Sequence, residues 1–455
     1  MNSLRTFLAA AVACGLAWPS AALATHGMNP IAFDAHAAGL GGADTALSLS
    51  TLSLVRNPAS IAFLGTRVDL NLSLTVPSLT LNDEVQGQMV LNTDLASEDA
   101  IFPLFGVAFA TEVTDGLHLG LGVYAQGGLG ADFKGLATFA DGDASAALTT
   151  NPSPATYDTH SKVQYLRIAP TVAYALSDAV SLGAALHVGL AQMEFSHSGM
   201  QFPEADGDHV YVPHAIDFAS DWALTLSGSV GLQAALLEGD LRFGTSLVFG
   251  AKPAFEGELT LDGQLTYDAK TDDFGWPLGV AFGVAGRVFD DALLLSADFR
   301  FDLWSDSVDE VTITGDLSSQ GPPDFAKVQL PFVLDWRDRA VLALGAELAV
   351  VRDLLAVRLG YAYSPSPVTP SGVNALFPAV TDHHLTLGLG LSNIAGGLTL
   401  DLAAEVALAN EVTSDATNQM AFEPAMPGAT PSANGYRVGV EMSQIAAHVK
   451  VGWVF

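Results

Sequence analysis

Residues 436–455 read YRVGVEMSQIAAHVKVGWVF, and this stretch decides the fold class. Val449, Val451, Trp453 and Phe455 fall on one face of it, because side chains alternate between the two faces of a β-strand. The stretch is long enough to cross a bilayer as a tilted strand. We interpret it as the closing strand of a membrane β-barrel, whose terminal Phe455 is read by the barrel-assembly machinery. A last strand that merely happens to end in Phe is the alternative.

The same period of two runs through about fourteen segments of similar length. In residues 292–304, for example, Leu295 and Phe299 oppose Asp298 and Arg300. The segments lie near residues 66–77, 101–113, 116–127, 162–176, 180–195, 220–237, 240–255, 276–289, 291–304, 333–349, 353–364, 382–394, 396–410 and 436–455. Tight turns alternate with long polar connections, which is typical of outer-membrane barrels with short periplasmic turns and long external loops. The fold class we predict is all-β, a transmembrane antiparallel barrel of about 14 strands.

Composition supports a barrel and excludes several other classes. The chain is 49% hydrophobic with 15% charged residues, yet beyond the first segment it lacks the run of about 18 apolar residues that a membrane helix needs. A net charge of −31 argues against nucleic acid as a partner, because phosphate binding needs Lys and Arg. The acidic stretches read as solvated external loops. A divalent-cation site at Glu204, Asp206 and Asp208 is a weak alternative, since such ions take about six or more arranged oxygens.

The first residues are interpreted as a targeting segment. Arg5 precedes an apolar stretch, and Ala22-Leu23-Ala24 resembles a cleavage site, so we predict a signal peptide over residues 1–24. The only cysteine, Cys14, lies in this segment. An acylated lipoprotein cysteine at this position is the alternative. If the signal peptide is removed, Cys14 is removed with it, and the exported chain has no thiol and no disulfide.

Residues 25–64 differ from the rest of the chain. They are rich in Ala, Gly and Ser and contain no strand of membrane length. A barrel of this size would leak unless its lumen were filled. We therefore predict that residues 25–64 form a plug inside a barrel of residues 65–455. A periplasmic extension is the alternative. At the strand ends, Trp222, Trp304 and Trp336 are expected in aromatic girdles at the membrane surfaces.

Four segments, in order along the chain, carry a resemblance to a known family. They are GLGGA at 39–43 followed by Arg56-Asn57-Pro58-Ala59, PLGVAF at 277–282 leading into Trp304-Ser305, DWRD at 335–338, and VRLGYAYSPSPV at 357–368. Together they resemble the FadL/TodX family of outer-membrane transporters of long-chain fatty acids and aromatic hydrocarbons. Asp335 stands where Asn is expected, and the loops around 195–220 and 255–275 differ from the family pattern.

The resemblance implies passive, ligand-gated diffusion. A hydrophobic molecule would bind an external groove, pass to a tighter site beside the plug, or hatch, and leave sideways through a kink in the third strand. A sideways exit suits a solute that gains about 0.8 kcal/mol per methylene on leaving water. Glycine clusters in strands mark bends, so we place the kink at Gln126, Gly127, Gly128 and Gly130. An ordinary glycine-rich turn is the alternative.

A fatty acid needs a partner for its carboxylate, because an unpaired buried charge is costly. By strand parity, six basic residues face the lumen: Arg167, Arg242, Arg300, Arg337, Arg339 and Arg358. The alternative is structural, because Asp298, Asp302 and Asp335 share these faces and could pair with the arginines across strands. In the hatch, Arg56 is expected to anchor to acidic lumen groups. Asn57 and Pro58, followed by Ala59, are expected to fix a tight turn.

No catalytic residues, metal ligands or cofactor are predicted, because the histidines are scattered and no nucleophile stands in a recognisable context. We predict an outer-membrane protein of a Gram-negative bacterium that takes up long-chain fatty acids or similar molecules. An aromatic-hydrocarbon channel and a structural or adhesive barrel are the alternatives. The plug argues against a water-filled porin. The expected partners are the hydrophobic ligand, outer-membrane lipid with lipopolysaccharide, and the assembly machinery, with the chain acting as a monomer.

Overall fold

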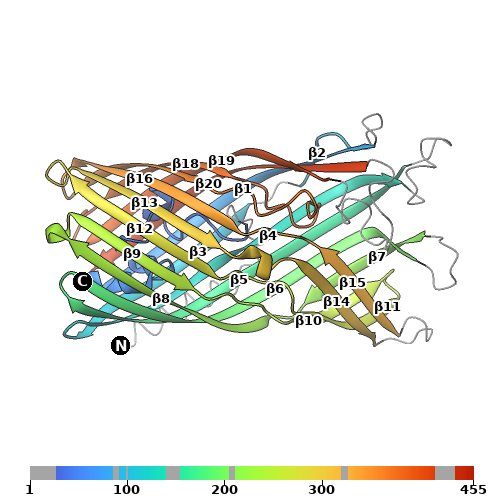
Figure 1. Cartoon of the computed structure of the whole chain (residues 1–455), viewed down its shortest axis with the longest axis horizontal. Helices are drawn as coiled ribbons and strands as arrows, with labels where there is room; N and C mark the ends of the chain where they lie inside the picture. Colours follow the sequence, from blue (N-terminus) through green and yellow to red (C-terminus); the bar gives the residue numbers. More distant parts are fainter. Residues whose placement is uncertain are drawn as a thin grey trace.

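A computed structural model describes residues 27–85, 92–98, 101–139, 154–203, 211–318, 326–415 and 436–455 of the chain. Its strands form one antiparallel sheet that closes into a barrel (Figure 1). The predicted signal peptide with Cys14 lies outside the described residues, as does the acidic group at 204–208. Within the described ranges, no helix is both long and apolar enough to cross a membrane.

Fourteen strands form the closed ring, and each pairs with the next. They are β1 (Arg67–Val85), β3 (Phe102–Thr114), β4 (Leu117–Phe139), β5 (Pro154–Ser177), β6 (Val180–Pro203), β8 (Ala223–Leu236), β9 (Leu241–Val248), β12 (Gly279–Val288), β13 (Leu293–Asp302), β16 (Arg339–Val351), β17 (Leu355–Tyr363), β18 (His383–Leu391), β19 (Leu398–Thr413) and β20 (Tyr436–Val454). Pairing of β20 with β1 closes the ring, from Arg67 opposite Val454 to Val85 opposite Tyr436. Each of the fourteen predicted segments overlaps one of these strands, so the predicted architecture is confirmed.

Shorter strands extend the sheet beyond the ring. They are β2 (Leu95–Ala96), β7 (Tyr211–Ser220), β10 (Phe255–Leu261), β11 (Leu265–Thr271), β14 (Glu310–Leu317) and β15 (Lys327–Val333). Five of them continue from β6 in the order β7, β10, β11, β14 and β15, at the end of the barrel away from the tight turns (Figure 1). The sequence analysis did not predict this outer sheet, because its strands lie within the long polar connections between the membrane-length segments.

Residues 27–64 lie inside the lumen and form the hatch. They contain only short helices, α2 (Ala35–Gly39), η1 (Thr51–Val55) and η2 (Pro58–Phe63). Backbone and side-chain groups of the hatch hydrogen-bond to strands on different sides of the ring. Ala35 N donates to Asn71 Oδ1 of β1 at 2.9 Å, and Thr45 N donates to Asp298 Oδ2 of β13 at 2.9 Å. These residues therefore contact the wall on different sides of the ring, and the plug role of residues 25–64 stays a prediction.

Glycines in the wall allow the hatch backbone to approach closely. A Cβ at Gly183 of β6 would lie 2.3 Å from Ala59 N, and one at Gly231 of β8 would lie 2.0 Å from Asn57 Oδ1. A residue with a side chain cannot occupy such a position without displacing its neighbour. The hatch motif thus rests on two wall positions that have to be glycine.

The three tryptophans predicted for the aromatic girdles divide into two groups. Trp222 is exposed on the outer surface, where a girdle residue is expected. Trp304 and Trp336 are instead buried, and their rings meet edge to face at 5.2 Å. The prediction of a girdle position was wrong for these two. Both lie outside the regular strands, in segments that turn into the lumen, so strand parity does not apply to them.

The close approach at Gly183 yields a prediction. The change Gly183→Ala should lower the free energy of unfolding by about 1–3 kcal/mol, because overpacking forces backbone shifts. It should also speed amide hydrogen exchange in η2. Heat-induced unfolding in detergent and exchange followed by mass spectrometry measure the two effects. Gly286→Ala is the control, since the nearest atom to its Cβ is Asp240 O at 3.6 Å. Equal behaviour of the two variants would contradict the proposed contact.

Candidate functional site

The wall between β3 and β4 is interrupted. Pairing of these strands ends with Gly106 opposite Tyr124, and the register of β4 against β5 shifts between Ala125 and Gly127, which marks a bulge at Gln126. Farther along, Ser97 forms a bridge with Phe133. Between these points the described residues show no backbone pairing of β4 with β3.

The start of the hatch lies against this bulge. Gly128 N donates to Met28 O at 3.1 Å, and Gln126 Nε2 donates to Asn29 Oδ1 at 2.8 Å. Gly127 has φ +137°, and a Cβ there would lie 2.0 Å from Met28 O. Gln126, Gly127 and Gly128 therefore stand at the interruption that the hatch covers. Gly130, the fourth residue of the predicted kink, lies farther along β4 in regular pairing with Lys162.

A narrow cavity adjoins the bulge on the lumen side. Its volume is about 60 Å³. Hatch residues Asn29, Phe33 and Arg56 line it together with wall residues, among them Gln126, Arg167, Ser246, Val248, Trp276, Arg300 and Asp302. The structure thus brings two of the six predicted wall arginines to one space beside the hatch.

Arg167 is a buried cation held by neutral groups. Its Nη1 donates to Gln126 Oε1 at 3.1 Å, and the guanidinium lies 4.8 Å from the ring centroid of Tyr165. Its Nε has no hydrogen-bond partner, and neither does the Tyr165 hydroxyl. Among the described residues, no carboxylate lies within ion-pair distance of Arg167.

Arg358 is paired with two carboxylates. It donates to Glu347 Oε2 and Asp401 Oδ1, both at 2.6 Å. His36 of the hatch reaches Glu347 at 2.8 Å, and Lys450 reaches Asp401 at 2.9 Å. Arg358 therefore belongs to a network that joins neighbouring strands to helix α2, as the structural alternative expects.

Arg300 and Arg339 are also buried close to acidic groups. Arg300 Nη1 donates to Ile31 O of the hatch at 3.4 Å. Arg339 Nε lies 3.7 Å from Asp302 Oδ2, and its guanidinium lies 5.8 Å from the Trp304 ring. Arg300 thus has a hatch partner. Arg339 has only the ion pair with Asp302, since none of its guanidinium nitrogens forms a hydrogen bond.

The last two candidates lie away from the cavity. Arg242 is half-buried near a tight turn, where Nε donates to Gly239 O at 3.3 Å. Arg337 does not face the lumen, so the lumen-facing position predicted for this residue was wrong. It is exposed in the segment before β16 and donates from Nε to Ser366 O at 2.9 Å. Parity failed there because the regular strand begins only at Arg339.

The hatch motif is anchored differently from the prediction. Arg56 Nε donates to Asp44 Oδ1 at 3.2 Å, so it pairs within the hatch and not with the wall. Burial raises the pKa of the Asp44 carboxyl to about 6, and the Arg56 charge opposes this rise. Asn57 Oδ1 accepts a hydrogen bond from Ala59 N at 3.1 Å and caps η2, which begins at Pro58, as the sequence predicts.

The main anchor on the wall is Asp298, which the sequence suggested only as a partner for arginine. Its Oδ2 accepts hydrogen bonds from Asp44 N at 3.0 Å, Thr45 N at 2.9 Å and Thr45 Oγ1 at 2.6 Å. An acidic residue on the lumen face was visible in the sequence, but nothing there indicated that backbone N–H groups of the hatch would be its donors.

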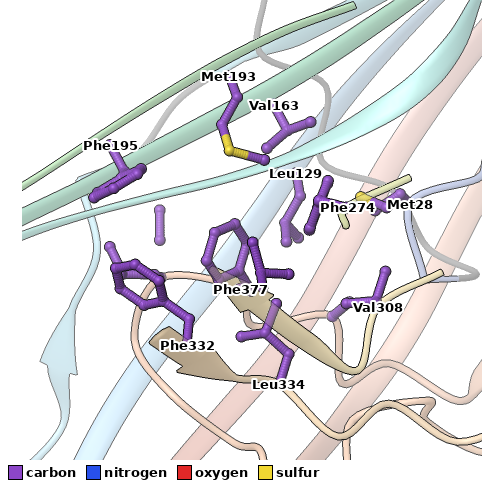
Figure 2. Packing of buried hydrophobic residues seen from close by; sticks show 14 of the residues in the cluster. Met28, Leu129, Val163, Met193, Phe195, Phe274, Val308, Phe332, Leu334 and Phe377 are labelled. Atoms are coloured by element: carbon purple, nitrogen blue, oxygen red, sulfur yellow. The ribbon is translucent and has the colours of Figure 1, made fainter. Parts of the chain in front are cut away.

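The lumen on the outer side of the hatch is apolar. A large cluster of buried hydrophobic residues fills it, and Figure 2 shows Phe195, Phe332 and Phe377 among them, with Met28 at one edge. The segment between β17 and β18 folds into this space, where Phe377 lies 5.6 Å from Phe274. An apolar region therefore runs from the outer loops to the hatch residue that covers the β4 bulge.

A closed membrane barrel with an internal hatch and an apolar outer lumen defines an outer-membrane transport protein. The chain belongs to the family described as "Outer membrane protein transport protein (OMPP1/FadL/TodX)", whose model matches residues 31–445. Its place is the outer membrane of a Gram-negative bacterium. No curated protein matches the chain significantly. Within the described part of the chain, no group of three or more His, Cys, Asp or Glu could hold a metal ion.

Solved structures share the fold at low sequence identity. The Ralstonia pickettii toluene transporter TbuX is 20% identical over 93% of this chain and 98% of its own, with a TM-score of 0.65. The P. putida toluene transporter TodX is 17% identical over 93% and 99%, with a TM-score of 0.70. A Pseudomonas aeruginosa FadL homologue is 14% identical over 96% and 100%, with a TM-score of 0.72.

The Asp298 anchor yields a prediction about leakage. Asp298→Ala removes the acceptor of three hydrogen bonds, each worth about 1.5–3 kcal/mol when one partner is charged. The hatch should loosen at residues 44–45, and ion conductance through the barrel in planar bilayers should rise. Asp268→Ala, an exposed carboxylate of the outer sheet, is the control. Unchanged conductance together with unchanged amide exchange at residues 44–45 would contradict this role of Asp298.

Proposed function

We propose that the protein takes up long-chain fatty acids or similar apolar carboxylates by passive, ligand-gated diffusion. The observation that carries this proposal is the buried Arg167, which lines the cavity beside the hatch and lacks a carboxylate partner among the described residues. A buried cation without a counter-charge is costly. A ligand carboxylate would supply the missing charge at this position.

The apolar lumen accounts for the other part of such a ligand. Transfer of each methylene from water into the apolar cluster contributes about 0.8 kcal/mol. A long acyl chain therefore gains enough to bind among residues such as Phe195, Phe332 and Phe377, while the headgroup faces the cavity. Near Arg167, the Tyr165 hydroxyl and Trp276 Nε1 are buried donors without partners, so they extend the same site.

The bulge in β4 supports a sideways exit. Met28 and Asn29 cover the stretch where β4 leaves β3, and they are held there by the hydrogen bonds to Gly128 and Gln126. Gln126 also contacts Arg167, so a ligand that binds Arg167 competes for a group that holds the hatch. We propose that this competition releases the start of the hatch and opens the wall toward lipid.

An aromatic hydrocarbon is the second candidate ligand. Aromatic rings line the path, with Trp276 at 4.2 Å from Tyr165 and Phe274 between Phe255 and Phe377. A neutral hydrocarbon would use these rings and would have no need of Arg167. The two candidates therefore differ in how they depend on one residue.

The proposal also covers the partners of the barrel in the membrane, beginning with the C-terminal Phe455. Phe455 is 75% exposed, and its backbone N–H donates to Thr66 O at 3.0 Å. This exposure makes its ring available to the barrel-assembly machinery. The belt of exposed leucines and valines would contact outer-membrane lipid and lipopolysaccharide. One barrel contains the whole cavity, so a monomer suffices for transport.

Replacing Arg167 separates the two ligand classes. Arg167→Met should lower uptake of labelled hexadecanoic acid about tenfold or more, because a hydrogen bond to a charged group contributes about 1.5–3 kcal/mol. Toluene uptake should stay unchanged. Proteoliposomes that contain the purified protein allow both rates to be measured, with a sugar as the polar reference. Lys327→Met, which removes an exposed charge from the outer sheet, is the matched control.

Each outcome of this experiment is informative. Equal loss of both ligands, with a folded barrel, would show that Arg167 has a structural role. Toluene uptake without fatty acid uptake in the unchanged protein would favour the aromatic-hydrocarbon channel. Rapid passage of the sugar would contradict transport of hydrophobic molecules altogether.

A further inference from the structure

The ring contains a second interruption, between β8 and the segment that joins β9 to β10. Phe249 N donates to Gly228 O at 2.9 Å, and Asp221 N donates to Glu256 O at 2.8 Å. Residues 222–227 and 250–255 lie between these two bonds and are all described, yet no backbone hydrogen bond joins them. We call these two facing stretches the β8 split.

The burial pattern explains why the ladder fails here. The bonds at both ends set one register, in which Leu224 would stand opposite Pro253. Leu224 is exposed and Pro253 is buried, whereas directly opposed residues in a sheet share a face. The two strands are therefore out of phase by one residue within the split, and they cannot pair.

Two irregularities in the alternation of buried and exposed residues create this phase difference. Alternation of burial is interrupted at Asp221-Trp222 on one strand and at Phe249-Gly250 on the other, because both residues of each pair are exposed. These two irregularities lie at opposite ends of the split. The interruption is thus built into the sequence of both strands.

Leucines on the lipid side of the split are strongly exposed. Leu224 and Leu226 are 65% and 68% exposed, whereas Leu295 and Leu344, in the continuously paired wall of β13 and β16, are 48% and 43% exposed. Leu359, on a strand that is paired on both sides, is also 61% exposed, so exposure alone does not mark the split. The missing backbone pairing is what leaves a strand edge at this place.

Spaces on both sides of the wall are lined by neighbouring residues at the Phe249 end of the split. Outside, an apolar groove of about 790 Å³ is lined by residues that include Leu186, Leu226, Phe249 and Gly250. Inside, the cavity that holds Arg167 is lined by Val248 and Trp276. Val248, the last residue of β9, thus lines the cavity, and the next two residues line the groove.

The lumen side of the split carries unused hydrogen-bonding groups. The Thr225 and Ser227 hydroxyls of β8 are buried without partners, as is the Ser246 hydroxyl of β9 in the cavity wall. A carboxylate that leaves Arg167 would meet these donors on its way to the split. Polar groups on the lumen side and leucines on the lipid side match the two ends of an amphiphile.

We infer that the β8 split is a second lateral passage, through which the apolar carboxylate ligand moves between the cavity and the lipid. This inference rests on the proposed function and adds a route distinct from the β4 bulge. The bulge opens toward β3, whereas the split lies on the far side of β5 and β6. The ligand's chain would occupy the outer groove while its headgroup remains near Thr225 and Ser227.

Joining the two edges of the split tests the inference. Leu224→Cys with Ala254→Cys places two exposed thiols on opposite edges, and a short bis-maleimide then links them. Apart from Cys14 the sequence has no other cysteine, so linking is specific. The control is Leu295→Cys with Leu344→Cys, on adjacent strands of the paired wall. Initial uptake of labelled hexadecanoic acid into proteoliposomes is measured before and after linking, and mass spectrometry gives the linked fraction.

Linking across the split should reduce the initial uptake rate to about half or less, since one of two exits is closed, while the control pair should keep its rate. An unchanged rate in fully linked protein would overturn the inference and leave the proposed function intact. Absence of uptake in the unlinked protein would instead refute the proposed function.

A second variant covers the case in which the thiols fail to link. Ala254→Trp adds bulk at the exposed edge of the split without any chemistry, and Ala297→Trp adds it to the paired wall. Slower uptake by Ala254→Trp alone supports the passage. Equal rates in the two variants would overturn it.

Discussion

Closure of the hydrogen-bond ladder is the constraint on which the whole structure depends. Inside a bilayer no water is available to the backbone, so each N–H and C=O must find a partner within the protein. Fourteen strands meet this requirement by pairing around a ring that β1 and β20 close. Any long stretch of unpaired strand therefore needs an explanation, and the described part of the ring has the β4 bulge and the β8 split. At the β4 bulge the hatch supplies partners, because Met28 O accepts from Gly128 N.

The backbone groups of the hatch, inside the lumen, also need hydrogen-bond partners. Its helices are too short to satisfy their own backbone, so the wall provides acceptors and donors for it. Asp298 accepts from the backbone of Asp44 and Thr45, and Asn57 Nδ2 donates both to Thr45 O and to Leu232 O of β8. These bonds hold the hatch in the half of the lumen near the tight turns (Figure 1). The outer half is left to apolar side chains, and this division gives an amphiphile two matching surroundings.

The sequence predicted the strands well, because a period of two is a local property. It also placed five of the six arginines on or near the lumen face. It could not identify Arg167 as a fully buried arginine without a carboxylate, because pairing depends on strands far apart in the chain. Arg358, for example, meets Asp401 across β17, β18 and β19. The buried positions of Trp304 and Trp336 were missed for a related reason, since parity ends where regular strands end.

The positions of the two interruptions suit the proposed transport through the wall. Strands β4, β5, β6 and β8 form a panel, with the β4 bulge at one edge and the β8 split at the other. Arg167 stands on β5, within this panel, and contacts Gln126 of β4. The strand register places Arg167 two strands from Thr225 of β8, through Gly189 of β6, while the hatch anchor Asp298 lies on β13. In the proposed route, hydrophobic cargo would reach lipid at the panel's edges without the hatch leaving its main anchor, and the barrel would stay closed to small polar solutes.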